Sequence, residues 1–416
     1  MEVKAGYKRT DMGVIPEDWD NQLLAALTAY PVQNGIFNNP EKKGRGYKLI
    51  NVVNLYVSNP IDVSNLELVD ATKAELDTFK VNHGDIFFTR SSLTADGIAQ
   101  CNVYDEKENE LILFDCHLIR VKPDKKKVNP FFLFRYCQAS NARKYFITNA
   151  KTTTMTTIDQ AIIGKLPVSL PPLLEQNSIA TALSDIDLQI SLLIRLITKK
   201  RDMKQAAMQE LLTGKQRLPG FDGEWETKRL GEIGECFIGL TYDPNNVKSN
   251  GLLVLRASNI DNNGLKFDDN VFVDVEIPEK LIVRKDDILI CVRSGSRDLI
   301  GKCALISTNV KDMTFGAFMS IFRTQFSHFV FYQFQSGLVK KQIYENIGAT
   351  INQITNKNLK SFQIPFPKDE NEQRAIATVL SDMDAELAAL EQQRDKTKAI
   401  KQGMMQELLT GRIRLV

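Results

Sequence analysis

The chain of 416 residues carries a net charge of +2 and is 43% apolar and 25% charged. This composition is typical of a globular protein with two or three domains. No apolar run approaches the roughly 18 residues that a membrane span needs, and the N-terminal sequence lacks the apolar core of a signal peptide. We therefore expect a cytoplasmic protein that does not associate with a membrane. The balanced charge neither indicates nor excludes nucleic-acid binding, because binding needs only a local basic surface.

Cysteine and histidine positions indicate no metal site. The six cysteines form no CxxC pair, and the three histidines are scattered, so no zinc-ligand spacing is recognised. Reduced and mostly buried thiols are expected.

A first globular domain is expected over residues 1–170. The apolar strand "GDIFFTRSS" (Gly84–Ser92) is followed by a second apolar stretch and then by a helix that begins near Asn129 and Pro130. A threonine-rich loop (Lys151–Thr157) precedes a strand that runs into proline.

A long helix is expected next, over residues 171–216. Apolar residues recur at alternating steps of four and three, which is a heptad seam. The seam residues are Ile179, Leu183, Ile186, Ile190 and Leu193. Gly214 follows where a C-terminal cap is expected.

The second half of the chain repeats this order. A second domain is expected over residues 217–367 and a second long helix over residues 368–416. Segments Gln176–Gly214 and Gln373–Gly411 align without a gap and are identical at about half of their positions, including "MQELLTG" at both ends. The second seam consists of Ile376, Leu380, Met383, Leu387 and Leu390. Each helix is about 58 Å long at 1.5 Å per residue.

The repeat predicts an α+β fold with two pseudo-symmetric globular domains joined by two long helices. An apolar seam of this length needs a partner, and the sister helix is the obvious one. A seam that packs only on its own domain is the alternative. In the globular stretches the patterns align but the side chains differ, which indicates that the helices share a role that the domains do not.

Several enzyme motifs are approached but none is complete. The segment "GSRDLIGKC" (Gly295–Cys303) is one residue too long for a phosphate-binding loop and ends in cysteine. "NPFF" (Asn129–Phe132) resembles an amino-methyltransferase loop but lacks its second proline. The carboxylates Asp185, Asp187, Asp382 and Asp384 lie on the helices, where further metal ligands would have to converge from other elements. We expect a non-catalytic chain, with these carboxylates solvated or ion-paired.

The segments "LPPLLEQNSIATALSDIDLQI", "MQELLTG", "LPGFDGEW" and "NEQRAIATVLSDMDAEL" resemble the specificity subunit of type I restriction–modification systems over essentially the whole chain. The resemblance implies two target-recognition domains, each of which reads one half of a bipartite site in double-stranded DNA. It also implies that the two helices form an antiparallel coiled coil, which sets the spacing between the halves.

The resemblance further implies partner subunits. Two modification subunits would bring S-adenosylmethionine and adenine-N6 methylation, and two motor-nuclease subunits would bring ATP, Mg²⁺ and DNA cleavage. No cofactor is then expected on this chain itself. A stand-alone DNA-binding protein with two reading domains, or a coiled-coil scaffold, remains an alternative.

Candidate DNA contacts are polar side chains that follow the matching strands or lie in polar loops, because arginine can read guanine while serine reaches phosphates or base edges. The first candidates are Arg90, Ser91, Ser92, Arg293, Ser294, Ser296 and Arg297. The second candidates are Lys42, Lys43, Arg45, Lys151, Thr154, Thr350, Asn352 and Gln353. A solvated loop or a structural arginine is the alternative at each position.

Overall fold

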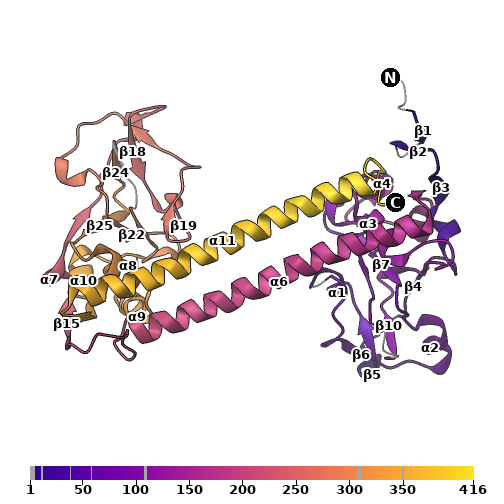
Figure 1. The fold of residues 1–416 in the computed structure, drawn as a ribbon, viewed down its shortest axis with the longest axis horizontal. Coiled ribbons are helices and arrows are strands. Elements are labelled where there is room, and N and C mark those ends of the chain that lie inside the picture. Colours follow the sequence, from indigo (N-terminus) through magenta and orange to yellow (C-terminus); the bar gives the residue numbers. More distant parts are fainter. Residues whose placement is uncertain are drawn as a thin grey trace. The chain divides into compact units, whose positions relative to one another are not determined.

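The computed structural model describes residues 5–10, 13–37, 39–57, 59–106, 110–306, 312–348 and 351–416. Contacts divide the chain into two compact units, residues 1–193 with 393–416 and residues 194–392. Each unit contains one globular domain and a part of both long helices, α6 (Leu173–Leu211) and α11 (Glu370–Leu408) (Figure 1). The domain boundaries predicted from the sequence, after residues 170, 216 and 367, lie at the ends of the long helices and not within them. They stay a prediction.

Antiparallel strands in the order β4-β11-β7-β9 form the central sheet of the first unit. Side chains of β7 and β11 are buried throughout, because one face packs on the helices and the other on a second small sheet. The strands are β1 (Tyr7–Thr10), β2 (Gly13–Pro16), β3 (Asp20–Leu23), β4 (Gln33–Asn34), β5 (Lys43–Ile50), β6 (Glu67–Val69), β7 (Ile86–Thr89), β8 (Ser91–Ser92), β9 (Cys101–Val103), β10 (Ile112–Phe114), β11 (Leu118–Val121), β12 (Lys151–Thr152), β13 (Thr156–Thr157) and β14 (Pro167–Leu170).

Shorter helices accompany these strands. They are α1 (Asn54–Val57), α2 (Lys73–Phe79), α3 (Pro130–Gln138), α4 (Ser140–Asn149) and α5 (Gln160–Gly164). Helix α3 begins as predicted, because the Asn129 side chain accepts hydrogen bonds from the Phe131 and Phe132 amides and Pro130 occupies the first turn.

The second unit repeats the central sheet in the order β16-β25-β22-β23. Its strands are β15 (Trp225–Arg229), β16 (Glu235–Ile238), β17 (Val247–Lys248), β18 (Leu252–Leu255), β19 (Ile260–Asp261), β20 (Gly264–Leu265), β21 (Phe272–Val273), β22 (Ile288–Cys291), β23 (Cys303–Leu305), β24 (Met313–Phe315), β25 (Met319–Arg323) and β26 (Gln363–Pro367). Its short helices are α7 (Leu230–Ile233), α8 (Ser327–Gln335), α9 (Gly337–Asn346) and α10 (Asn356–Ser361). The expected α+β fold with two similar domains is confirmed.

Helices α6 and α11 run antiparallel within each unit. In the first unit Lys401 of α11 pairs with Asp187 of α6 at 2.6 Å. In the second unit Lys204 of α6 pairs with Asp384 of α11 at 2.5 Å, and Lys200 pairs with Glu386 at 2.6 Å. The lysine comes from α11 in the first unit and from α6 in the second, and the carboxylate comes from the other helix each time. A duplication with two-fold pseudo-symmetry requires this exchange.

Both long helices end at a left-handed glycine, as the sequence predicts. Gly214 has φ +71° and Gly411 has φ +69°. A β-carbon at Gly411 would come within 2.4 Å of Pro16, and one at Gly214 within 3.0 Å of Trp225. Glycine is therefore needed at both positions for the backbone angle and for close contact with the chain that enters the neighbouring domain.

In the described residues, no helix is long and apolar enough to cross a membrane.

Candidate nucleic-acid interface

In the first unit two of the predicted polar segments lie in one small sheet. Strand β13 pairs with β8 on one side and with β12 on the other, so that Ser91 lies opposite Thr157 and Ser92 opposite Thr156. We call the strands β12, β13 and β8 the polar sheet. Lys151, Thr154 and Arg90 are exposed around it. The structure thus brings together two candidate segments that are about sixty residues apart in the sequence.

The second unit has a similar arrangement, which we call the polar bridge. Arg293 forms an antiparallel bridge with Gln353, and the Ser294 amide donates to the Asn352 carbonyl at 3.2 Å. The Asn352 side chain donates to the Gly295 carbonyl at 3.1 Å. Ser296 and Arg297 follow on the exposed loop, whereas Thr350 lies outside the described residues.

The loop after β8 in the first unit is held on α4, and the loop after β22 in the second unit is held on α9, but by different groups. In the first unit Arg143 of α4 donates to the carbonyls of Ala99 and Asp96 at 2.7 and 2.8 Å. In the second unit Arg297 of the loop lies 4.1 Å from the Tyr344 ring of α9 and donates to the Tyr344 carbonyl at 3.3 Å. Arg297 is therefore partly occupied by its own domain.

The basic segment around Lys43 belongs to a different sheet, in which β5 pairs with β6 and β10. Lys42 is paired with Glu75 at 2.7 Å, and Arg45 with Asp70 at 3.1 Å. The hydrogen bond from Lys42 lowers the pKa of Glu75 to about 2. Two of these three predicted contacts therefore already have a carboxylate partner.

Exposed apolar and aromatic side chains border the polar surfaces and were missing from the predicted set. Leu93 is 86% exposed directly after β8, and Met155 lies at the β12–β13 turn. Phe318 and Ile351 are about half exposed beside the polar bridge. Leu93, Met155 and Ile351 are next to predicted polar residues in the sequence, which is a signal that could have found them. Phe318 meets Arg293 only in the folded domain.

The group Asp115, Cys116 and His117 carries three potential metal ligands within 4.8 Å of one another. Asp115 already accepts hydrogen bonds from the His117 amide and from His117 Nδ1, at 2.8 and 2.6 Å. These bonds close the turn that leads into β11, so the contacts are explained by the local backbone. The sequence search for separated ligand pairs did not find this consecutive run.

Two of the four repeated helix carboxylates, Asp187 and Asp384, are ion-paired, and the other two, Asp185 and Asp382, are exposed, as expected. Asp187 contacts Arg135 of α3 as well as Lys401. Asp384 accepts a hydrogen bond from the Tyr332 hydroxyl at 3.0 Å in addition to its pair with Lys204. Burial, followed by the charge of Asp384, raises the pKa of Tyr332.

Each domain is tied to a helix end by the same contact of one arginine, one glutamate and one tryptophan, which we call the domain latch. In the first latch Arg414 donates to Glu175 at 2.7 and 2.8 Å, and Trp19 Nε1 donates to Glu175 at 3.1 Å. Arg414 also donates to Asp18, and this hydrogen bond lowers the pKa of Asp18. The chain that enters the first domain therefore lies beside the C-terminal residues.

The second latch repeats the arginine, glutamate and tryptophan contact. Arg217 donates to Glu372 at 2.5 and 2.7 Å, and Trp225 Nε1 donates to Glu372 at 3.1 Å. Each arginine lies 5.7 Å from the ring of its tryptophan. Both glutamates are 1–2% exposed, so their charges depend on these partners.

The predicted seam residues lie at the buried side of the helices to different degrees. Ile179, Leu183, Ile376 and Leu380 are fully buried in the cores of their domains, and Ile186, Ile190 and Leu193 are nearly so. Met383, Leu387 and Leu390 are half-buried. Leu408, the last residue of α11, and Leu409, which follows it, complete the core of the first unit.

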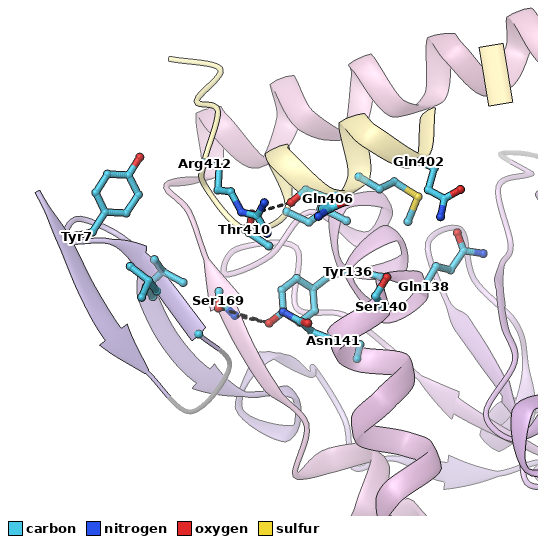
Figure 2. Close-up of a pocket in the computed structure, with 17 residues that line it drawn as sticks. Tyr7, Tyr136, Gln138, Ser140, Asn141, Ser169, Gln402, Gln406, Thr410 and Arg412 are labelled. Atoms are coloured by element: carbon cyan, nitrogen blue, oxygen red, sulfur yellow. Dashed lines mark hydrogen bonds between the residues drawn. The ribbon is translucent and has the colours of Figure 1, made fainter. Parts of the chain in front are cut away.

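A cavity of about 910 Å³ opens in the first unit beside the end of α11 (Figure 2). The N-terminal hairpin, the α3–α4 corner and the last turn of α11 line it. Tyr136 is held by hydrogen bonds with Ser169, and Arg412 donates to Glu407 at 3.1 Å. The lining residues that the structure describes include no histidine, cysteine, aspartate or glutamate, so they do not form a set of catalytic acid and base groups.

Comparison with known proteins gives consistent relatives. The chain is 28% identical to a protein of Methanocaldococcus jannaschii that is provisionally named as the specificity subunit of the type I restriction enzyme MjaX, over 98% of this chain and 97% of that protein. It is 29% identical to the specificity subunit of the type I restriction enzyme EcoKI of Escherichia coli, over 45% of this chain and 43% of the relative.

Solved structures show the same fold. The S subunit of the type I restriction–modification system of M. genitalium matches with a TM-score of 0.61 at 15% identity, over 98% of both chains. A chain from a study of complex assembly in the type I system matches with a TM-score of 0.59 at 18% identity, over 96% of this chain and 99% of that one.

The family model described as the type I restriction modification DNA specificity domain matches residues 18–199 and again residues 222–401. These two ranges contain the two globular domains, the polar sheet, the polar bridge and most of both long helices. The chain therefore belongs to the family of type I restriction–modification specificity subunits and carries two copies of its domain.

Proposed function

We propose that each domain of this chain reads one part of a bipartite DNA site, and that the chain itself carries out no chemistry. One observation supports this most strongly. The polar sheet and the polar bridge occupy equivalent places in the two domains but carry different side chains, Ser91 and Thr157 in one and Arg293 and Gln353 in the other. Two domains with one backbone and different exposed groups suit the reading of two different sequences.

We assign the long helices two roles, setting the distance between the two parts of the site and docking two modification subunits. Each helix is 39 residues long, and its charged pairs and seam give it one register against the sister helix. S-adenosylmethionine would then act in the modification subunits. ATP and Mg²⁺ would act in two motor-nuclease subunits, all in the cytoplasm.

Methylome sequencing tests this proposal. The chain is expressed with its modification subunit in cells that lack other adenine methylation, and the methylated positions are mapped. The expected result is one asymmetric site of two short sequences separated by a spacer of fixed length and free sequence. A symmetric site without a spacer, or no new methylation, would contradict the proposal.

DNA binding by the complex is also expected to weaken steeply as salt rises, because phosphate contacts release counterions. Titration at several salt concentrations measures the slope. A flat response would show that contacts to phosphates contribute little.

A further inference from the structure

The hydrogen-bond ladders set the residue equivalence between the two DNA-reading surfaces. The Arg90 amide donates to the His117 carbonyl, and the Arg90 carbonyl accepts from the Ile158 amide at 3.0 Å. In the second unit Val292 makes the same two bonds, with the Phe318 carbonyl at 3.0 Å and the Ile354 amide at 2.9 Å. Arg90 is therefore the counterpart of Val292, and not of Arg293.

One position further along, Ser91 is the counterpart of Arg293. Each residue has a cross-strand partner, Thr157 for Ser91 and Gln353 for Arg293. Residues directly opposite on antiparallel strands bring their side chains together on one face. The first domain thus presents two hydroxyl groups at this position, and the second presents a guanidinium and an amide.

The surroundings of Arg293 hold its side chain without neutralising it. Its guanidinium lies 4.9 Å from the centre of the Phe318 ring, and its amide donates to the Phe318 carbonyl at 3.1 Å. Phe318 is itself 54% exposed. An aromatic face can orient an arginine and still leave its five N–H donors free.

Other arginines of the second unit have carboxylate partners. Arg256 pairs with Asp269, Arg284 with Glu279 and Arg323 with Asp287. In the described part of the chain, no ion pair involves Arg293. A positive group that is exposed, oriented and unpaired is suited to an external partner with two acceptors in one plane.

We propose that Arg293 reads a guanine in the second half of the DNA site and that Phe318 is the residue that positions it. This inference rests on the proposed function. The O6 and N7 acceptors of guanine in the major groove match the arginine fork, and such a pair is the commonest specific contact to a base. Gln353 lies beside Arg293 and contacts the adjoining base pair. The first domain has no arginine at this position, so its half-site is read by hydroxyl groups instead.

Base analogues test the assignment on the intact complex. The half-site of the second domain is identified by exchanging residues 217–367 for those of a relative and mapping methylation again. Each guanine in that half-site is then replaced in turn by 7-deazaguanine, which lacks the N7 acceptor. At one position the substitution is expected to weaken binding by about fivefold or more, because one bond of the bidentate pair is lost.

Variants identify the side chain that contacts the N7 acceptor of this guanine. Arg293→Ala is expected to weaken binding by about tenfold to a hundredfold at that guanine and to abolish the effect of 7-deazaguanine. Arg293→Lys keeps the charge but not the fork, and is expected to lose most of the discrimination. Arg284→Ala, which removes another exposed arginine of the same unit, is the matched control and is expected to change neither.

Phe318 has its own test. Phe318→Leu is expected to reduce discrimination at the same guanine severalfold, whereas Phe318→Tyr keeps the ring and is expected to retain it. Recognition of the first half-site should stay unchanged in both variants, and this separates positioning from a general loss of folding.

Four results would overturn the inference. A second half-site without guanine, or an Arg293→Ala variant that keeps the full 7-deazaguanine effect, would refute the assignment while leaving the proposed function intact. Equal binding losses on all DNA sequences would assign Arg293 to a phosphate. A complex that methylates no bipartite site would overturn the proposed function and this inference together.

Discussion

The domain latches are alike in the two units, whereas the polar surfaces, which are the polar sheet of the first unit and the polar bridge of the second, carry different side chains. Both latches have a glutamate that accepts from an arginine and from a tryptophan, and the tryptophan–glutamate distance is 3.1 Å in each. The cross-strand pairs on the polar surfaces share their backbone geometry but none of their side-chain chemistry. Residues that hold a domain on its helix are thus kept in both copies, whereas the cross-strand pairs of the polar surfaces are not.

The helix carboxylates are an intermediate case. Asp187 and Asp384 each pair with a lysine of the opposite helix in the same geometry. The third group is Arg135 in the first unit and Tyr332 in the second. The contact between helices is therefore constant, while the contact from helix to domain tolerates a change of side chain.

The largest expected effect comes from making the two units identical. A fragment of residues 1–219 keeps the first domain, α6 and the turn with Arg217, but it lacks α11 and therefore Leu408 and Leu409 of the first core. The exposed seam should pair with its own copy, with Arg217 in the place of Arg414. We expect a two-fold homodimer that directs methylation to a palindrome of the first half-site.

Sedimentation and methylome mapping check this prediction. The control is a fragment of residues 1–213, which lacks Gly214 and Arg217 and should dimerise poorly. A soluble monomer of residues 1–219 would show that the helices do not pair as symmetric equivalents. So would a dimer that still methylates the original asymmetric site.

Sequence alone predicts the long helices well because their signal is local. The heptad steps, the terminal glycines and the repeated "MQELLTG" all lie within the segments that they describe. The domain latches are harder to predict, because Trp19, Glu175 and Arg414 are distant in the chain and meet only in the folded unit.

The polar surfaces could be predicted as segments but not as residue pairs. The apolar strands Ile86–Thr89 and Ile288–Cys291 can be aligned with more than one register by sequence, since neighbouring positions are similarly apolar. Only the ladder shows that Ser91, and not Arg90, matches Arg293. A shift of one residue on a strand moves a side chain to the other face, so the chemistry of the site depends on this register.

The second largest effect is expected on the stability of one unit when the arginine of its latch is replaced. Arg414→Ala leaves Glu175 buried without its arginine and is expected to lower the free energy of unfolding of the first unit by about 3 kcal/mol. Arg217→Ala should destabilise the second unit by a similar amount. Urea unfolding of the full chain, with separate probes at Trp19 and Trp225, measures both. Strongly unequal losses would refute the equivalence of the latches.

Acidification is expected to destabilise the first latch through Asp18, by less than the loss of an arginine does. The Arg414 hydrogen bond lowers the pKa of Asp18 from 3.8, so its contribution to stability is present above that value and is lost as the pH falls further. Asp18→Asn should therefore reduce the loss of stability of the first unit on acidification below about pH 4. Urea midpoints at pH 7 and in the acid range measure this difference. An unchanged pH dependence would show that Asp18 gains little from Arg414.

A smaller effect is expected at the helix carboxylates. Tyr332→Phe removes the hydrogen bond to Asp384 while Lys204 still compensates the charge, so a loss of about 1 kcal/mol is expected for the second unit. A double-mutant cycle with Asp384→Ala isolates the pair. A coupling free energy near zero would mean that the hydrogen bond between Tyr332 and Asp384 stabilises the unit no more than hydrogen bonds to water do.

The smallest effect is expected for the basic segment at the start of β5, where two of the three predicted DNA contacts are already paired within the domain. Arg45 is largely exposed and pairs with Asp70, so Arg45→Ala should change stability by less than about 1 kcal/mol. Its charge is also partly offset by Asp70, so DNA affinity should fall less than twofold, with the salt dependence unchanged. Lys43 has no ion pair in the described residues and is the sharper probe. A reduction of the salt slope by about 1 in Lys43→Ala would identify a phosphate contact on this sheet, and would show that the DNA-reading surface of the first domain extends beyond the polar sheet.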